Sequence, residues 1–244
     1  MKNTFLSIII PCFNERKTIV EIINRIKLIK KIKKQIILID DCSSDGTRRI
    51  IKKKLLNKVN KIIFHKANKG KGSAIISSQK FIKGNLVIIQ DADLEYSPKD
   101  YYKLIKPFKN KKTNIVYGSR VLGRKSKINL FNIYNISKNF RIFANYVLTK
   151  ISNIINNQSL TDVHTCYKVF RKDIFLSLNL KEKDFAFCPE VTTKISKLGY
   201  QILEVPITYN GRNFKEGKKI QLKDAFKALY TIIKYRYSKF WSSF

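Results

Sequence analysis

Residues 88–98 of the chain read IIQDADLEYSP. The apolar run at 86–89 predicts a buried strand that ends just before Asp91 and Asp93. Because successive side chains of a strand point to opposite faces, these two carboxylates are expected to share one side, with Glu95 close behind. Carboxylates crowded at a strand end repel each other unless a cation lies between them, and their hard oxygen atoms suit Mg²⁺ or Mn²⁺. The segment therefore predicts a divalent metal that holds a diphosphate.

The same segment also fits a simpler interpretation, a solvated acidic turn that leads into a helix. In that interpretation Ser97 is the N-cap and Pro98 occupies the first helical position. Two aspartates alone do not separate the interpretations, because short motifs match by chance. The neighbouring strands have to decide between them.

Strands and helices alternate through the first half of the chain, which predicts an α/β fold with a doubly wound, mostly parallel sheet and flanking helices. Sheets of this kind bind ligands at the carboxyl ends of their strands. The expected strands are Leu6–Ile10, Ile36–Ile39, Lys61–Phe64, Leu86–Ile89 and Ile115–Tyr117, and the expected helices are Thr18–Ile29, Thr47–Leu56, Ser73–Phe81 and Lys99–Phe108.

Two further strands end in polar residues. The first runs into PCFNE at 11–15, and the second runs into DDCSSDG at 40–46. Acidic strand ends that converge on one edge of a sheet favour a ligand site over an isolated acidic turn. A dinucleotide-binding protein would carry GxGxxG after its first strand, and the chain has neither that motif nor a P-loop. Hydride chemistry with a nicotinamide cofactor is therefore disfavoured.

The second half of the chain is less regular. Its patterns predict one or two helices over Phe131–Ile155, a loop leading into a strand over Thr161–Phe170 and a helix over Phe187–Leu198. A strand is expected over Ile202–Tyr209, and Pro206 places it at a sheet edge. A basic loop over Gly211–Gly217 and a helical tail over Gln221–Phe240 follow.

Composition excludes several classes of protein. Four scattered cysteines without a CxxC pair argue against a zinc site and a disulfide framework, and they fit a reducing compartment. Two histidines make a multi-histidine metal centre implausible. The apolar run at 6–11 is too short for a signal peptide, and no run of about 18 apolar residues predicts a membrane-spanning helix. We expect a cytoplasmic protein, or one in peripheral contact with the cytosolic face of a membrane.

The formal net charge of +33 would attract nucleic acid, anionic lipid or anionic substrates. The cationic residues, however, are spread over the whole chain, which is rich in Lys, Ile and Asn together. Much of the charge is therefore expected to be solvated surface, and no specific nucleic-acid partner is predicted.

Taken in order, the motifs resemble family-2 glycosyltransferases with the GT-A (nucleotide-diphospho-sugar transferase) fold. The nearest branch is that of the dolichol- and polyprenol-phosphate mannose synthases. The resemblance covers nearly the whole chain. It rests on SIIIPCFNE (with Phe13 in the usual Tyr position), ILIDDCSSDGT, NKGKGSA, QDADLEYSP, GSR at 118–120, TDVHTCYKVFRKDIF, and FCPEVTTKISKLGYQILEVPITYNGRNFKEGKKI.

The resemblance implies a single glycosyltransferase domain over residues 1–244. About residues 1–120 would form the half that binds the nucleotide-sugar, and about 121–244 the acceptor half with a C-terminal amphipathic helix. The residues that the resemblance implies for nucleotide-sugar binding are Pro11, Phe13, Glu15, Ile39, Asp41, Asp91, Ala92, Asp93, Arg120, Arg212 and Lys218.

The resemblance also implies a metal site and a set of catalytic residues. Asp93 and Glu95, with Asp91, would hold Mg²⁺ or Mn²⁺, and Arg120 would bind substrate. Asp162 completes the catalytic set. A hydroxyl acceptor would need Asp162 as a base, whereas a phosphate acceptor needs no base and would leave Asp162 an orienting role.

The expected reaction is an inverting transfer of a sugar, with mannose from GDP-mannose as the first candidate, to a polyprenyl or dolichyl phosphate. Arg124, Lys125 and Lys127 are candidates for the lipid phosphate, and the C-terminal helix is a candidate for membrane contact. One alternative is transfer to a saccharide hydroxyl of a cell-envelope polysaccharide. A remoter alternative is a non-catalytic, basic protein that binds nucleic acid or membranes. The intact acidic motif argues against this alternative. The oligomeric state stays open.

Overall fold

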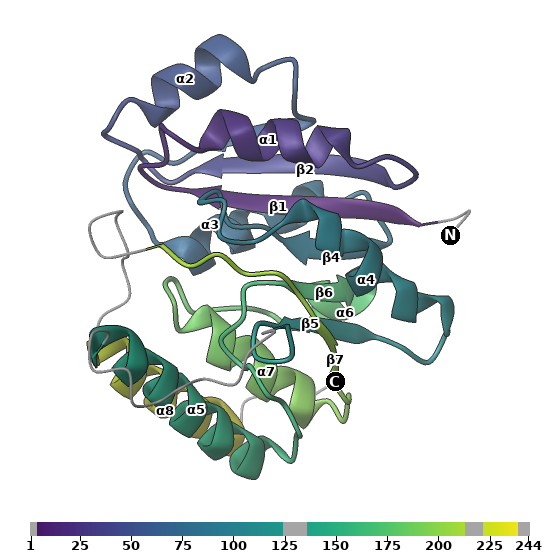
Figure 1. Cartoon of the computed structure of the whole chain (residues 1–244), viewed down its shortest axis with the longest axis vertical. Coiled ribbons are helices and arrows are strands. Elements are labelled where there is room, and N and C mark those ends of the chain that lie inside the picture. The colour runs from purple at the N-terminus through teal and green to yellow at the C-terminus, as the bar shows by residue number, and fades with distance from the viewer. Residues whose placement is uncertain (1–3, 124–135, 213–221, 239–244) are drawn as a thin grey trace.

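The computed structural model describes residues 4–123, 136–212 and 222–238. A seven-stranded mixed sheet in the order β3-β2-β1-β4-β6-β5-β7 forms its centre, and helices flank it (Figure 1). The strands are β1 (Phe5–Cys12), β2 (Lys33–Asp40), β3 (Lys61–Phe64), β4 (Leu86–Ile89), β5 (Ile115–Ser119), β6 (Lys168–Arg171) and β7 (Leu203–Pro206).

β1 lies between two parallel neighbours, and its side chains are buried on both faces. It pairs in parallel with β2 on one side and with β4 on the other. Leu6 and the run Ile8–Ile10 are fully buried. Continuous burial of this kind is typical of a parallel strand that is covered on both faces. Every strand expected from the first half of the sequence is present.

β6 is the element that makes the sheet mixed. It comes from late in the chain, yet it lies between β4 and β5 and runs antiparallel to both. The loop that leads into a strand over Thr161–Phe170 is therefore confirmed, whereas its place between two earlier strands was not predicted. β7 pairs with β5 alone and forms an edge, as Pro206 predicted.

The helices mostly follow the expected pattern. The buried side chains of α1, for example, recur at helical spacing as Ile19, Ile22, Ile23 and Ile26. The α-helices are α1 (Ile19–Leu28), α2 (Thr47–Lys54), α3 (Lys71–Ser78), α4 (Tyr101–Ile105), α5 (Ile136–Asn156), α6 (Lys172–Ser177), α7 (Phe187–Lys197) and α8 (Leu222–Tyr237), and three 3₁₀ turns are η1 (Gln79–Phe81), η2 (Pro98–Asp100) and η3 (Lys106–Lys109).

One helix prediction needs correction, and one helix was missed. The single helix expected over Lys99–Phe108 is instead a short α4 between two 3₁₀ turns, η2 and η3. Pro107 has no N–H to donate, and its ring clashes with the preceding turn, so a regular helix cannot pass through it. The short helix α6 directly after β6 was not predicted at all.

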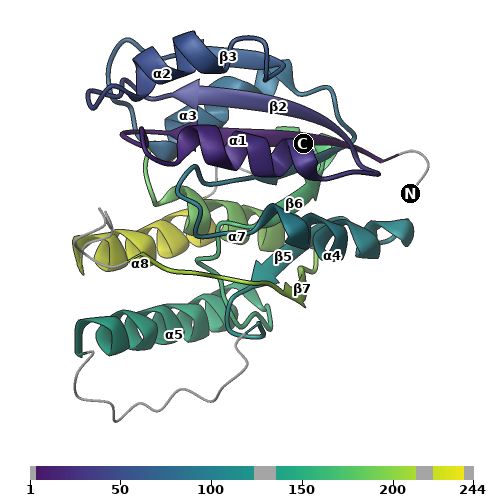
Figure 2. The same ribbon diagram turned by 45° about the horizontal axis from the view of Figure 1, so that its top comes forward.

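α5 and α8 pack against each other and lie opposite α2 in Figure 1, and Figure 2 shows α5 below α8. α7 packs against both of the other helices. Within residues 4–123, 136–212 and 222–238, no helix combines the length and apolarity that crossing a membrane requires.

Candidate active site

The loops that follow β1, β2 and β4 each contain a residue other than glycine in the left-handed region. These residues are Asn14 (φ 55°), Cys42 (φ 62°) and Leu94 (φ 66°). Such backbone strain persists only where surrounding contacts fix it, and it gathers at functional sites. All three positions lie at the carboxyl edge of the sheet, where a doubly wound fold binds its ligand.

Hydrogen bonds hold the loops after β1 and β2 together. The backbone N–H of Asn14 donates to the Ser43 hydroxyl (2.9 Å), and the Asn14 side-chain oxygen accepts from the backbone N–H of Ser44 (2.9 Å). The N–H of Glu15 donates to the Thr47 hydroxyl (2.9 Å). Because both loops are fixed to each other, Phe13 and Glu15 are carried on a rigid support.

Asp41 is buried, and its carboxylate already has protein donors. It contacts Nδ1 of His65 (2.6 Å) and accepts hydrogen bonds from the backbone N–H groups of Lys69 (3.0 Å) and Gly70 (2.7 Å). It thereby anchors the turn that leads into α3. Ile39 of β2, which is also expected at the nucleotide, is fully buried beside Pro11, its register partner in β1.

Lys71, at the start of α3, is a site residue that sequence reasoning missed. Its Nζ lies 2.5 Å from Oδ1 of Asp91. Burial opposes the charged form of Lys71, but Asp91 and the neighbouring thiols raise the pKa of its ammonium well above the ordinary value. The glycine-rich segment KGKGSA, which matched the family pattern, was the available signal for it.

Asp93 is an acidic residue whose titration is strongly perturbed. Burial, together with repulsion from Asp91 and Glu95, raises the pKa of its carboxyl from 3.8 to about 7. Its Oδ1 accepts a hydrogen bond from the backbone N–H of Glu95 (3.1 Å). The neighbouring Ala92 is buried and brings no charge. A cation at this position would relieve the repulsion that holds the proton on Asp93.

Arg212, after β7, crosses the site to reach the loops of β1 and β4. Its guanidinium donates to both carboxylate oxygens of Glu15 (3.1 and 2.8 Å) and to the backbone carbonyl of Asp93 (2.9 and 2.6 Å). Its backbone N–H donates to Glu95 (2.7 Å), which also accepts from the Tyr209 hydroxyl (2.6 Å). The structure thus brings three predicted site residues, Glu15, Asp93 and Glu95, together around Arg212.

Arg120 follows β5 and forms a bidentate pair with Asp162. Its Nε and Nη2 lie 2.7 Å from the two carboxylate oxygens, and its backbone N–H donates to the same group (3.0 Å). Burial alone would raise the pKa of Asp162, but the Arg120 guanidinium outweighs it and lowers that pKa below its ordinary value. A carboxylate held in this way is a poor proton acceptor.

Glu190 of α7, another acidic residue of the second half of the chain, lies within the core. It is fully buried and pairs with Lys194 of the same helix (2.5 Å). Lys218 and the three cations at 124, 125 and 127 lie outside the described residues.

The carboxylates of Asp91, Asp93 and Glu95 are suitable ligands for a divalent cation, but the protein alone does not complete its coordination. Among the described residues, no three acidic, His or Cys side chains converge on one point. Asp91 and Glu95 are bonded to Lys71 and Tyr209 respectively. Mg²⁺ keeps several waters and substrate phosphates and needs only one or two carboxylates. The set of Asp91, Asp93 and Glu95 therefore fits a cation that arrives with a diphosphate.

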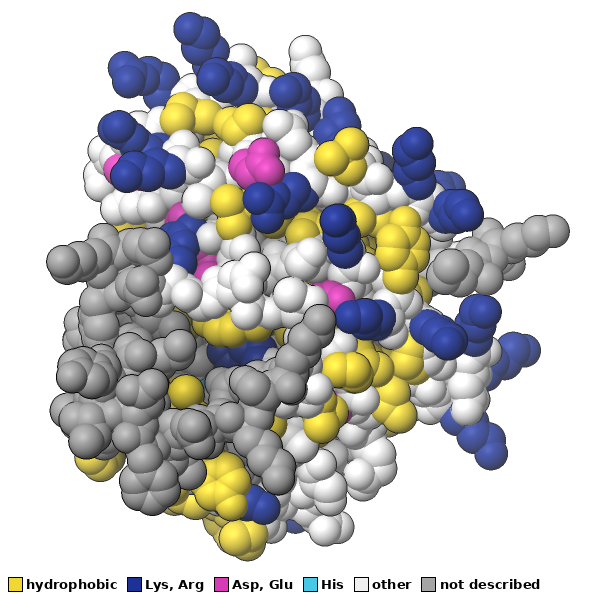
Figure 3. Space-filling model, in the orientation of Figure 1, with side chains coloured by type: hydrophobic (Ala, Val, Ile, Leu, Met, Phe, Trp, Pro, Cys, Tyr) yellow, Lys and Arg dark blue, Asp and Glu magenta, His cyan; other side chains and the backbone are white. Residues whose placement is uncertain are grey.

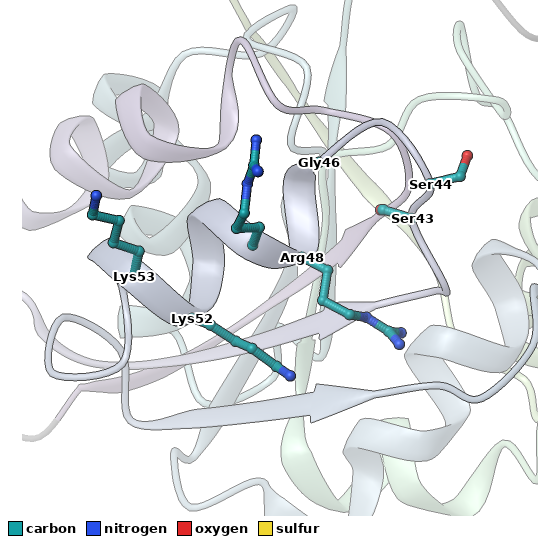
Figure 4. A pocket seen from close by; sticks show the side chains of 7 residues that line it. Ser43, Ser44, Gly46, Arg48, Lys52 and Lys53 are labelled. Atoms are coloured by element: carbon teal, nitrogen blue, oxygen red, sulfur yellow. The ribbon is translucent and has the colours of Figure 1, made fainter.

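A surface pocket of about 610 Å³ lies beside the β2 loop. Its lining includes Ser43 and Ser44 of that loop and cationic side chains of α2 (Figure 4). Two of these cations have a structural role, because Arg48 and Lys52 both lie over the Phe64 ring of β3 and Arg48 also binds buried Asp40 (2.6 Å). The pocket lies outside the rim formed by Asp91, Asp93 and Glu95.

Comparison with known proteins gives a consistent result. Residues 7–178 match the family model described as "Glycosyl transferase family 2". A dolichol-phosphate mannosyltransferase of Pyrococcus furiosus is 29% identical over 216 residues, which are 87% of this chain. The chain spans 58% of the length of that relative.

A second relative matches over its whole length. The UDP-N-acetylglucosamine–dolichyl-phosphate N-acetylglucosaminyltransferase of Methanococcus voltae is 27% identical over 257 residues, covering 98% of this chain and 99% of the relative. Among solved structures, glucosyl-3-phosphoglycerate synthase from Mycobacterium tuberculosis, in complex with Mn²⁺, UDP and glucosyl-3-phosphoglycerate, superposes with a TM-score of 0.68 at 15% identity. It covers 96% of this chain and 80% of its own. That likeness concerns the fold.

Proposed function

The chain belongs to glycosyl transferase family 2 and has the GT-A fold, and from this premise we propose that it transfers a sugar from a nucleotide-sugar to a polyprenyl or dolichyl phosphate. The proposed transfer inverts the anomeric centre, depends on a divalent metal and takes place at the cytosolic face of a membrane. Both curated relatives described above carry dolichol phosphate or dolichyl phosphate in their names, which supports an acceptor of this class.

The observation that carries the donor side of the proposal is the acidic rim. Asp93, whose carboxyl has a pKa of about 7, lies between Asp91 and Glu95 at the carboxyl end of β4. Asp93 and Glu95, with Asp91, would hold Mg²⁺ or Mn²⁺ when donor binds. A bound divalent cation would neutralise charge on the departing nucleoside diphosphate. Pro11, Phe13, Ile39, Asp41 and Ala92 are proposed to line or support the nucleotide pocket.

Arginine side chains would supply the remaining charge. Arg212 is proposed to bind the donor diphosphate together with Lys218. The ion pair between Arg212 and Glu15 would keep the guanidinium oriented before the donor binds. Arg120 is proposed to hold the acceptor phosphate through guanidinium N–H groups other than the Nε and Nη2 donors that bind Asp162. Arg124, Lys125 and Lys127 remain proposed helpers on the acceptor side.

The state of Asp162 favours a phosphate acceptor over a hydroxyl. Asp162 is fully buried, paired with Arg120, and has a lowered pKa, so it is poorly suited to remove a proton. A phosphate oxygen is already an anion and needs no base. It can attack the anomeric carbon from the face opposite the diphosphate, forming a new C–O bond as the bond to the diphosphate breaks. Asp162 would then orient Arg120.

The sugar is proposed to be mannose from GDP-mannose, with UDP-N-acetylglucosamine as the second donor to test because the Methanococcus relative is named for it. The test incubates the purified protein with a panel of labelled sugar nucleotides, Mn²⁺ and polyprenyl phosphate, with and without EDTA. We expect label in a lipid that mild acid cleaves, and its loss with EDTA. Label that appears only in polysaccharide, or transfer that EDTA leaves unchanged, would overturn the proposal.

A further inference from the structure

Positive charge alone cannot select the residue that binds an acceptor phosphate in this chain. The formal net charge is +33, and Figure 3 shows Lys and Arg side chains at many places on one face of the molecule. Arg120 differs from these exposed cations because its side chain is mostly buried (19% exposed). A binding site needs a cation whose orientation is fixed, and the contacts of Arg120 supply that orientation.

The aromatic ring of Tyr209 provides one of these contacts. Asp162 holds one edge of the Arg120 guanidinium through Nε and Nη2. The Tyr209 ring covers one face of the same group, with 5.1 Å between the guanidinium carbon and the ring centroid. Because a cation is attracted to the face of an aromatic ring, this contact resists rotation of the guanidinium plane. One edge and one face are thus both held, and the remaining N–H groups keep a single direction.

The hydroxyl of the same tyrosine reaches the donor side. It donates to Oε2 of Glu95 (2.6 Å), while the backbone N–H of Arg212 donates to Oε1 (2.7 Å). A carboxylate has about four lone-pair positions, so Glu95 can still bind a cation while it accepts these two hydrogen bonds. Hydrogen-bond partners of this kind orient a metal ligand and are needed for full metal affinity.

Tyr209 is itself held in place. Its backbone forms an antiparallel bridge with Tyr96, and the centroids of the two rings are 5.1 Å apart. Tyr96 is buried, and its hydroxyl accepts a hydrogen bond from the backbone N–H of Cys166 (3.0 Å). Gly211 also packs closely against Tyr209, since a Cβ added at Gly211 would lie 2.9 Å from the ring. The ring therefore has little room to move.

We propose that Tyr209 is a positioning residue for both substrates. Its ring orients Arg120 toward the acceptor phosphate, and its hydroxyl orients Glu95 toward the metal that arrives with the donor diphosphate. This inference rests on the proposed function and adds a residue that touches neither substrate. Because the ring and the hydroxyl have different partners, removing one or both of them should have different effects.

The test compares Tyr209→Phe, which loses only the hydroxyl, with Tyr209→Leu, which loses the ring as well. Tyr209 is half-buried, so both variants should fold. Calorimetry measures the binding of GDP or UDP with Mn²⁺, and steady-state transfer to a short, water-soluble prenyl phosphate gives the acceptor KM. We expect both variants to bind the nucleotide about tenfold to a hundredfold more weakly. Only Tyr209→Leu should also raise the acceptor KM, by about two- to thirtyfold, because only this variant loses the cation–π contact.

Tyr102 provides the matched control. Its hydroxyl donates to the backbone carbonyl of Lys30 (2.5 Å), just before β2 begins and away from the site. Tyr102→Phe and Tyr102→Leu should leave the nucleotide affinity and the acceptor KM unchanged. Losses that match those of the Tyr209 variants would show a general effect of tyrosine removal and overturn the inference.

The two readouts also separate this inference from the proposed function. A normal acceptor KM in Tyr209→Leu, or an equal rise in Tyr209→Phe, would overturn the role of the ring. Normal nucleotide affinity in both variants would overturn the role of the hydroxyl. A wild-type protein that transfers sugar to no prenyl phosphate would overturn the proposed acceptor class, and the nucleotide affinities would still decide whether Tyr209 positions Glu95.

Discussion

At the level of single residues, the site is built from acids that are matched with cations brought from elsewhere in the chain. Asp91 meets Lys71, Glu15 meets Arg212, and Asp162 meets Arg120. Asp93 differs, because its acidic neighbours and its burial raise the pKa of its carboxyl to about 7. Asp93, which the resemblance implies as a metal ligand, is thus an acid whose charged form the metal-free protein destabilises.

The raised pKa of Asp93 predicts how stability depends on pH. Between 3.8 and about 7 the folded, metal-free protein holds a proton on Asp93 that the unfolded chain releases, so stability falls as pH rises through this window. Asp93→Asn should flatten that fall, and Mn²⁺ in the presence of a nucleoside diphosphate should raise the melting temperature of the wild type above pH 7 but not that of the variant. Thermal melts across this pH range, with and without Mn²⁺, make the measurement.

The control for this prediction is Asp173→Asn, which removes an exposed carboxylate from α6. Its pH dependence and its response to Mn²⁺ should match the wild type. An Asp93→Asn variant that still gains stability from Mn²⁺ would show that the metal binds elsewhere.

Arg212 is predicted to act through the paired N–H donors of its planar guanidinium group. Arg212→Lys keeps the charge but cannot bind Glu15 with two nitrogens or grip a diphosphate in the same way. Binding of the nucleoside diphosphate with Mn²⁺, measured by calorimetry, should weaken by about tenfold to a hundredfold. Arg16→Lys, an exposed arginine on the neighbouring loop, should leave it unchanged. Equal affinities for both variants would contradict the role of Arg212.

At the level of elements, α7 shows how a buried charge pair fixes a loop. Glu190 and Lys194 lie one turn apart with side chains 0 and 3% exposed. Glu190 also accepts hydrogen bonds from the backbone N–H groups of Lys181 (2.7 Å) and Glu182 (2.9 Å). The pair therefore joins α7 to the segment that packs against Gly70 and Gly72 of the α3 turn.

The chain offers a matched comparison for this pair, since Glu21 and Arg25 of α1 have the same spacing but are about half exposed. Glu190→Ala removes the carboxylate that balances the buried charge of Lys194 and should lower the free energy of unfolding by about 3–5 kcal/mol. Glu21→Ala should lower it by only about 0.3–0.5 kcal/mol. Urea unfolding of both variants gives the comparison, and similar losses would refute the proposed role of burial.

At the level of the whole molecule, the two halves of the chain are interleaved in one sheet. β6, from residues 168–171, lies between β4 and β5 and supplies the partner for both. Arg212 then returns from β7 to the loop after β1. The first and second halves of the chain therefore share one sheet, and neither has a complete sheet of its own.

This interleaving predicts that the first half does not fold alone. A fragment of residues 1–123 would leave buried side chains of β4 and β5, such as Val87 and Val116, without their β6 neighbours. We expect it to aggregate or to lack a cooperative thermal transition, whereas the full chain unfolds in one step. Size-exclusion chromatography and circular dichroism test this, and a monomeric fragment that melts cooperatively would contradict it.

The alternation of strands and helices and the spacing of the acidic motif were predictable from sequence, because both are properties of residues that are close together in the chain. Leu86–Ile89 and the Asp91–Asp93 pair occupy the expected places at the end of β4. The short α4 shows the limit of periodicity even locally, since one proline divides an apparently continuous helical pattern.

What the sequence determined by itself is therefore the alternation of strands and helices in the first half of the chain and the set of polar residues at the strand ends. Only the tertiary structure decided which charges meet. Lys71 and Asp91 are 20 residues apart, Arg120 and Asp162 are 42 apart, and Glu15 and Arg212 are 197 apart. Contacts over such separations depend on the path of the chain through the sheet, including the insertion of β6, and no local pattern encodes that path.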